Sequence, residues 1–102
     1  MEAERVRGLM GLCVRAGQTV FGEDGCMKAL RNGDCAVLLM DGDISPRTEE
    51  KYRRLCLRTG VPVVKLPAGW LEEATGRPGM AMAVRTGRLA EQLVSRIRCG
   101  EE

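Results

Sequence analysis

The chain has 102 residues, a length that suits a single domain covering residues 1–102 and is too short for two. Hydrophobic residues make up 44% of it, and no apolar run approaches the roughly 20 residues that a membrane span needs. The start, MEAERVRGL, does not resemble a secretory signal, so we expect a cytoplasmic protein without membrane contact. A net charge of +2 does not by itself indicate a nucleic-acid partner, although basic residues cluster locally.

The sequence contains no histidine, which excludes a mixed Cys/His zinc site and a Ser–His or Cys–His nucleophile. Neither GxxxxGK(S/T) nor GxGxxG occurs, so the usual nucleotide-binding loops are absent. We therefore predict no enzyme activity, no catalytic residue, no cofactor and no metal. The five cysteines form no CxxC pair and stand mostly among apolar neighbours, which is typical of small buried hydrophobic residues: Cys13, Cys26, Cys35, Cys56 and Cys99.

Apolar residues at helical spacing predict a first helix over residues 2–16, ended by Gly17. Gly8 and Gly11 lower the helix propensity of this segment, and we expect close contacts at both. Residues 19–21 (TVF) form a short predicted strand. A second helix follows over residues 23–31 and is closed by the turn at residues 32–33.

The apolar run of residues 36–40 (AVLLM) predicts a strand covered on both faces. Asp41 and Asp43 follow it, and roles in loop solvation and capping suit them better than acid–base chemistry or Mg²⁺ binding. Ser45 as cap and Pro46 in the first turn predict a helix that continues to about residue 59. The remaining predicted elements are a strand over 61–66, a helix over 67–75, a loop over 76–79, a strand over 80–84 and a helix over 86–97. This alternation indicates the α/β class, as a three-layer α/β/α sandwich.

Residues 19–33, TVFGEDGCMKALRNG, contain the main candidate site. Gly22 and Gly25 allow a close approach of the backbone, and the turn between them offers unpaired N–H groups at a helix start to anionic oxygens. Lys28 and Arg31 are three residues apart and share a helix face beside that turn. Together they form a candidate phosphate contact, although an ordinary capped helix with solvated charges would show the same residues.

Residues 22–25 (Gly22, Glu23, Asp24, Gly25) also match the bare GxxG spacing with which one RNA-binding module clamps a backbone. The two acids at the centre of this match repel phosphates. Phe21, Tyr52 and Trp70 are too few to build a base-stacking platform. If RNA is the ligand, its shape and backbone must carry the recognition.

Between residues 9 and 97 the sequence resembles the kink-turn-binding ribosomal-protein family of the archaeal and eukaryotic large subunit. It is most similar to the small bacterial members of that family, the YlxQ-type proteins. The order and spacing of four segments carry this resemblance: LCVRAGQTVFGEDGCMKALRNGDCAVLLM, DGDISPRTEEKYRRLC, GVPVVKL and ATGRPGMAMAV.

The resemblance implies a four-stranded mixed sheet and the binding of a sharply kinked RNA. RNA-binding members of the family open their second helix with Gly-x-Asn-Glu-x-x-Lys, and Gly22 and Lys28 match its glycine and its lysine. Asp24 replaces the asparagine and Gly25 the glutamate, at the two positions that touch the tandem G·A pairs of the kink. Asparagine donates and accepts hydrogen bonds, whereas an ionised aspartate only accepts and glycine offers no side-chain acceptor.

A second family contact is the loop before the last strand, which packs an apolar edge against flipped-out nucleotides. It corresponds here to Arg77, Pro78, Gly79 and Met80, and Arg77 adds a candidate phosphate or stacking contact. Ile44 matches a hydrophobic family position beside the same surface. Ordinary loop structure and core contacts are the alternative explanation for these residues.

These observations predict a non-enzymatic protein that binds structured RNA, either kink-turn-like or ribosomal, and acts in translation. The ribosome and translation factors are its expected partners. The alternative is a protein-interaction module that keeps the fold but has lost kink-turn recognition, which the residues at positions 24 and 25 favour.

Overall fold

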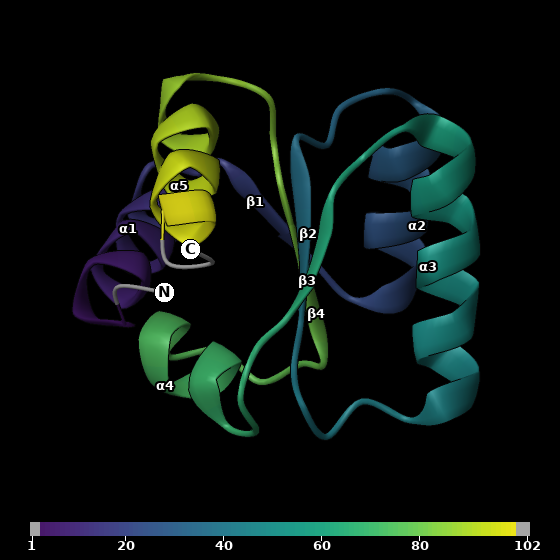
Figure 1. Cartoon of the computed structure of the whole chain (residues 1–102), viewed down its shortest axis with the longest axis horizontal. Coiled ribbons are helices and arrows are strands. Elements are labelled where there is room, and N and C mark those ends of the chain that lie inside the picture. Colours follow the sequence, from purple (N-terminus) through teal and green to yellow (C-terminus); the bar gives the residue numbers. More distant parts are fainter. Residues whose placement is uncertain (1–2, 100–102) are drawn as a thin grey trace.

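The computed structural model describes residues 3–99, in which helices and strands alternate along the chain (Figure 1). Three elements have the bounds that the sequence predicted, and the others differ from the prediction by one to three residues at an end. In chain order the elements are α1 (Ala3–Arg15), β1 (Thr19–Phe21), α2 (Glu23–Arg31), β2 (Val37–Met40), α3 (Pro46–Thr59), β3 (Val63–Lys65), α4 (Trp70–Thr75), β4 (Ala81–Val84) and α5 (Arg88–Cys99).

The strands form one four-stranded mixed sheet in the order β1-β4-β2-β3. Strand β4 runs antiparallel to both of its neighbours, β1 and β2, whereas β2 and β3 are parallel. Strands β1 and β2 therefore run in the same direction on either side of β4. The mixed sheet that the resemblance implied is confirmed.

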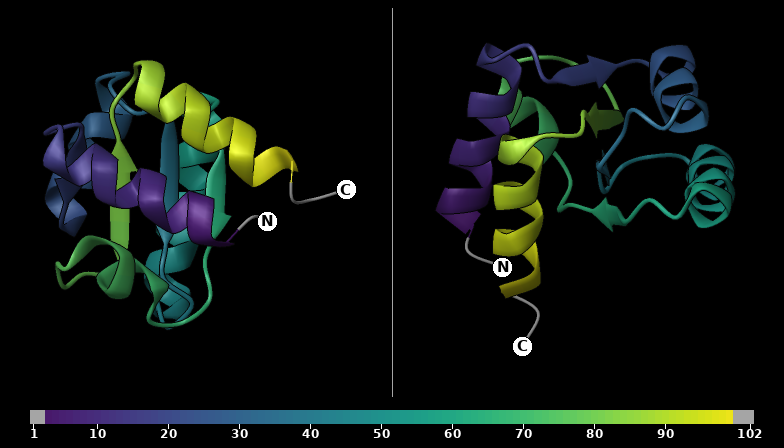
Figure 2. Two further views of the ribbon diagram at one scale, coloured as in Figure 1. Left: turned by 90° about the vertical axis from the view of Figure 1, so that its left-hand side faces the viewer. Right: turned by 90° about the horizontal axis from the view of Figure 1, so that it is seen from above.

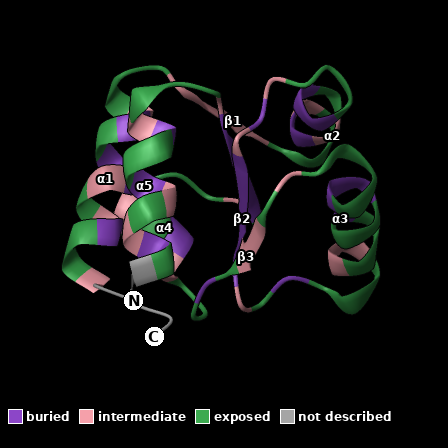
Figure 3. Cartoon of the chain, turned by 45° about the horizontal axis from the view of Figure 1, so that its top comes forward, coloured by how far each residue is buried: buried purple, intermediate pink, exposed green. Residues whose placement is uncertain are grey.

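Helices cover both faces of the sheet, which confirms the three-layer α/β/α arrangement. Helices α2 and α3 lie on one face, and α1, α4 and α5 lie on the other (Figure 2). One buried cluster lies under each layer, so the sheet separates two halves of the core. Every residue of β2 is buried, as the run AVLLM predicted, and the outer faces of the helices are exposed (Figure 3).

Helix α3 begins as its sequence predicts. The Ser45 hydroxyl accepts a hydrogen bond from the Thr48 N–H at 3.3 Å, and Pro46 occupies the first turn, where no N–H is needed. Gly60 ends the helix in the left-handed region, with φ of 73°. Local sequence signals alone account for both ends of this helix.

Helices α4 and α5 start later than the sequence predicted. Helix α4 begins at Trp70 instead of residue 67, because Gly69 in front of it has a φ of +85° that a helix cannot contain. Helix α5 begins at Arg88 instead of residue 86, because Gly87 has a φ of +150°. In both cases a glycine with positive φ sets the boundary.

The expectation of close contacts at both glycines of α1 is half right. A Cβ on the buried Gly11 would lie 3.3 Å from the carbonyl oxygen of Ala74, so α1 and α4 approach closely there. A Cβ on Gly8 would meet nothing within 4 Å. The prediction for Gly8 is wrong, because this residue faces solvent.

Four of the five cysteines are buried free thiols, as predicted: Cys13, Cys26, Cys35 and Cys56. The side chain of Cys99 lies outside the described residues. Burial raises the pKa of all four thiols, most clearly that of Cys35, to about 12. These thiols are neutral core side chains rather than reactive thiolates.

Candidate nucleic-acid interface

The register of the sheet brings the predicted RNA-binding segments together at one edge. The last residue of β1, Phe21, pairs with Met82, and the last residue of β2, Met40, pairs with Ala81. The turn into α2, the loop into α3 and residues 76–80 therefore meet where β4 begins. We call residues 22–25, Lys28 and residues 77–80 the docking edge.

A hollow of about 240 Å³ lies at this junction, between the start of α2, the first half of α3 and the start of β4. Gly22 and Glu23 line it from the start of α2, Thr48 and Tyr52 from α3, and Met80 from the loop before β4. Thr48 and Tyr52 were not among the predicted site residues. Their spacing of four in a helix is a common core pattern, so the sequence held no signal for their place in this hollow.

The start of α2 leaves its first N–H groups open to an outside acceptor. Gly22 has φ 88° and ψ 148°, a conformation that favours glycine, and it has no side chain to cap the helix. The first helical hydrogen bond runs from the N–H of Cys26 to the carbonyl of Gly22. The preceding N–H groups have no partner within the helix, which suits an anionic oxygen.

Gly25 has a packing role that the sequence did not predict. A Cβ at this position would lie 2.7 Å from Cγ1 of Val20 in β1, well inside van der Waals contact. The absence of a side chain therefore lets α2 lie close against the edge strand. Gly25 removes a side-chain acceptor from the docking edge and brings its backbone nearer to the sheet.

Charges of both signs lie on the exposed side of α2. Asp24, Lys28 and Arg31 are spaced four and three residues apart, and all three are exposed. Within residues 3–99 no ion pair is recorded for Lys28. Glu23 and Asp24 in the first turn stabilise the helix dipole and oppose a phosphate placed directly at the helix start.

The loop before β4 stacks on the last residue of β1. The Arg77 guanidinium lies over the ring of Phe21, with Cζ 4.5 Å from the ring centroid. Gly79 is also beside this ring: its φ is +147°, and a Cβ there would be 3.7 Å from Cδ1 of Phe21. Pro78 and Met80 are exposed, with 46% of the methionine accessible. Phe21 thus supports the loop, a role that the sequence did not indicate.

Asp41 links the loop before α3 to the loop before α4 by hydrogen bonds, next to the docking edge. Its side chain is 2% exposed, and its two carboxylate oxygens accept hydrogen bonds from the N–H groups of Asp43 and Gly69, each at 2.9 Å. Its own N–H donates to the carbonyl of Met80 at 2.8 Å. The capping role predicted for Asp41 and Asp43 is wrong, because Ser45 caps α3 and no side chain caps α4. Asp43 is exposed in the loop, as predicted, whereas Asp41 is buried and joins two loops.

Ile44 lies beside the docking edge but does not present its side chain there. It is 5% exposed and belongs to the core cluster under α2 and α3. Of the predicted site residues it is the one whose side chain is buried, which agrees with the core-contact alternative for this position.

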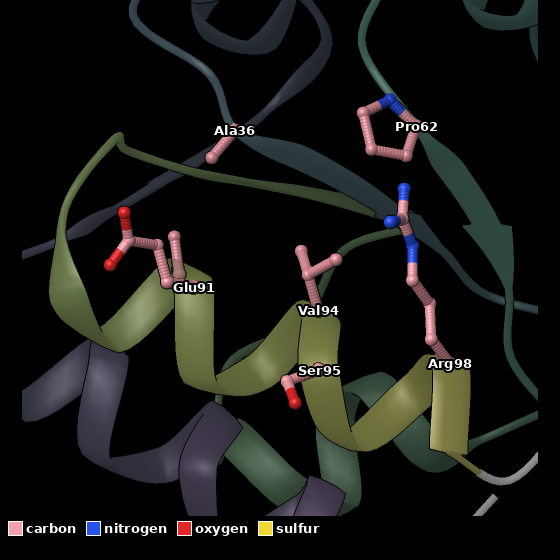
Figure 4. Close-up of a pocket in the computed structure, with 7 residues that line it drawn as sticks. Ala36, Pro62, Glu91, Val94, Ser95 and Arg98 are labelled. Atoms are coloured by element: carbon pink, nitrogen blue, oxygen red, sulfur yellow. The ribbon is translucent and has the colours of Figure 1, made fainter.

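Another hollow lies on the opposite layer, between α5 and the residues just before β2 and β3 (Figure 4). Ala36, Pro62 and Val94 are apolar lining residues, whereas Glu91 and Arg98 carry opposite charges, and the Arg98 side chain points toward Pro62. It shares no lining residue with the docking edge.

Residues 3–99 contain no cluster of three or more His, Cys, Asp or Glu side chains suited to a metal ion. No helix in that range is long and apolar enough to cross a membrane.

Comparison with solved structures finds the same fold elsewhere. A protein of unknown function from Bacillus halodurans superimposes with a TM-score of 0.85 at 25% identity, over 91% of this chain and 96% of the other. A Giardia lamblia 15.5kD RNA binding protein superimposes with a TM-score of 0.78 at 15% identity, over 97% and 90% of the two chains. These likenesses show the fold. No protein-family model and no curated protein sequence matches the chain.

Proposed function

We propose that this protein is a non-enzymatic RNA-binding protein that recognises a sharply kinked RNA at its docking edge and acts in translation. The observation that carries the proposal is the convergence of the open start of α2 and Met80 on one hollow, with Arg77 over Phe21 beside it. The exposed ammonium of Lys28 supports it. A structural neighbour with the same fold is named an RNA binding protein, which supports RNA as the ligand.

The chemistry of the docking edge assigns different roles to its residues. Lys28 meets a phosphate as a point charge, and Arg77 and Met80 offer a stacking and apolar contact to an unstacked base. Asp24 and Gly25 provide less base-edge hydrogen bonding than an asparagine and a glutamate would. Recognition therefore depends on the shape of the RNA backbone more than on the tandem base pairs of the kink.

Fluorescence titration tests this proposal with a kink-turn RNA, ribosomal RNA fragments and a straight duplex of the same length. We expect the kinked RNA to bind most tightly. Lys28→Ala should weaken this binding and reduce the slope of log K against log salt concentration by roughly one unit. Arg88→Ala, on the opposite layer, is the matched control and should leave both values unchanged. Equal, feeble binding to every RNA would refute the proposal.

A protein-interaction module is the second candidate, because the carboxylates of Glu23 and Asp24 stand in the first turn of α2 and repel phosphates. Affinity capture from a lysate, with and without nuclease, separates the two candidates. RNA recovered only without nuclease supports RNA binding. A protein partner that survives nuclease, with no RNA recovered, supports the second candidate.

A further inference from the structure

A basic groove runs between α2 and α3 on the same layer as the docking edge. Its volume is about 570 Å³, with Met27 and Leu55 among its lining residues. Four cations line it: Arg31 of α2, and Lys51, Arg54 and Arg58 of α3. The carboxylates of Glu23 and Asp24 lie at the end where α2 begins.

The groove is continuous with the docking edge. Glu23 lines both the groove and the hollow beside Met80, so an extended ligand can pass from one to the other. Helices α2 and α3 both follow strands that end beside the start of β4, so both point away from the docking edge. The cations therefore lie progressively farther from the docking edge along both helices.

The charges of this groove are largely available to a ligand. Arg54 is paired with Glu50 at 2.6 Å, on the exposed surface of α3. Within the described residues no ion pair is recorded for Arg31, Lys51 or Arg58, and all three are exposed. Basic residues near helix ends also stabilise the helix dipole, but Lys51 lies near the middle of α3, where that effect has faded.

We propose that this groove binds the phosphate backbone of the RNA helix that flanks the kink, as an extension of the docking edge. The inference rests on the proposed function. Lys51, Arg54 and Arg58 are spaced three and four residues apart, so they form one row of about 10 Å along α3. A row of this length can face more than one successive phosphate of a nucleic-acid strand.

Regular spacing favours a nucleic-acid backbone over an acidic protein. A polyanion with evenly spaced charges can meet each cation of the row in turn, whereas an acidic peptide would need carboxylates arranged to match. The opposite layer provides the contrast, because its hollow is lined by apolar residues and by one acidic and one basic side chain, Glu91 and Arg98 (Figure 4). The α2–α3 groove is the surface whose charge suits the RNA.

The test uses the full chain and two kinked RNAs that differ only in the flanking helix, one with about three base pairs and one with about ten. The variant is Lys51→Ala with Arg58→Ala, and the control is Arg88→Ala with Arg98→Ala on α5, which removes the same charge. For the long RNA we expect the groove variant to bind roughly 10- to 30-fold more weakly at 0.15 M salt, with a salt slope about 1.5 units smaller. The groove variant should bind the short RNA almost as tightly as the unmodified protein does. The control variant should bind both RNAs with the affinity of the unmodified protein.

The outcomes separate this inference from the proposed function. If the unmodified protein binds the short RNA specifically but the groove variant loses no affinity for the long RNA, the groove inference is wrong and the docking edge stands. If the unmodified protein does not distinguish kinked from straight RNA, the proposed function fails as well. An acidic protein captured from lysate by the unmodified chain and lost with the groove variant, at unchanged RNA affinity, also overturns the groove inference.

Discussion

Replacing Gly25 by alanine tests whether α2 lies against β1 as closely as the structure shows. Two effects of opposite sign compete. Alanine raises the helix propensity by up to about 1 kcal/mol relative to glycine. The new Cβ, however, would stand 2.7 Å from Cγ1 of Val20, where carbon atoms normally stay about 3.5–4.0 Å apart.

The clash should outweigh the gain in propensity. Val20 is β-branched, so its χ1 angle adjusts poorly, and relieving such overlap typically costs about 1–3 kcal/mol. We therefore expect Gly25→Ala to destabilise the protein by roughly 1 kcal/mol net, which lowers the melting temperature by about 4–8 °C. In a Val20→Ala background the same substitution should stabilise the protein, because the obstructing methyl group is gone.

Urea unfolding of the four proteins of this double-mutant cycle measures the coupling, expected at about 2 kcal/mol. Gly8→Ala is the matched control: it also lies inside a helix, but its Cβ would meet nothing within 4 Å, so it should stabilise the protein by about 0.5–1 kcal/mol. If Gly25→Ala stabilised the protein as much as Gly8→Ala, the close contact between α2 and β1 would be refuted.

Two further predictions concern the loops and the thiols. Asp41→Ala should lower the free energy of unfolding by about 2–4 kcal/mol, because two backbone N–H groups lose their acceptor, and Asp41→Asn should lower it less; denaturant midpoints near those of the unmodified protein would contradict this role. Stability should also fall above pH 9. Burial raises the pKa of Cys35 from 9.0 to about 12, so the unfolded chain loses this proton first as the pH rises, and the stabilisation present below pH 9 is lost through pH 12. Unfolding midpoints measured across this range should fall more steeply for the unmodified protein than for Cys35→Ala, and equal slopes would show that this thiol does not contribute.

The sequence by itself determined the elements whose signals are local. The Ser45-Pro46 start of α3, its end at Gly60 and the buried run of β2 each depend on residues within one segment, and the structure has them as predicted. The late start of α4 depends on the backbone conformation of Gly69, which a sequence does not specify because glycine adopts positive and negative φ with similar ease.

Only the tertiary structure decided which segments meet. Phe21 under Arg77, Asp41 between two loops and Gly25 against Val20 join residues of different elements, through contacts that periodicity within one element does not encode. The basic row of α3 is visible in the sequence, but its position beside Arg31 follows from the register that places β1 and β2 on either side of β4. A single chain carries its local conformational preferences in its residues, whereas the proximity of distant residues exists only once the sheet has formed.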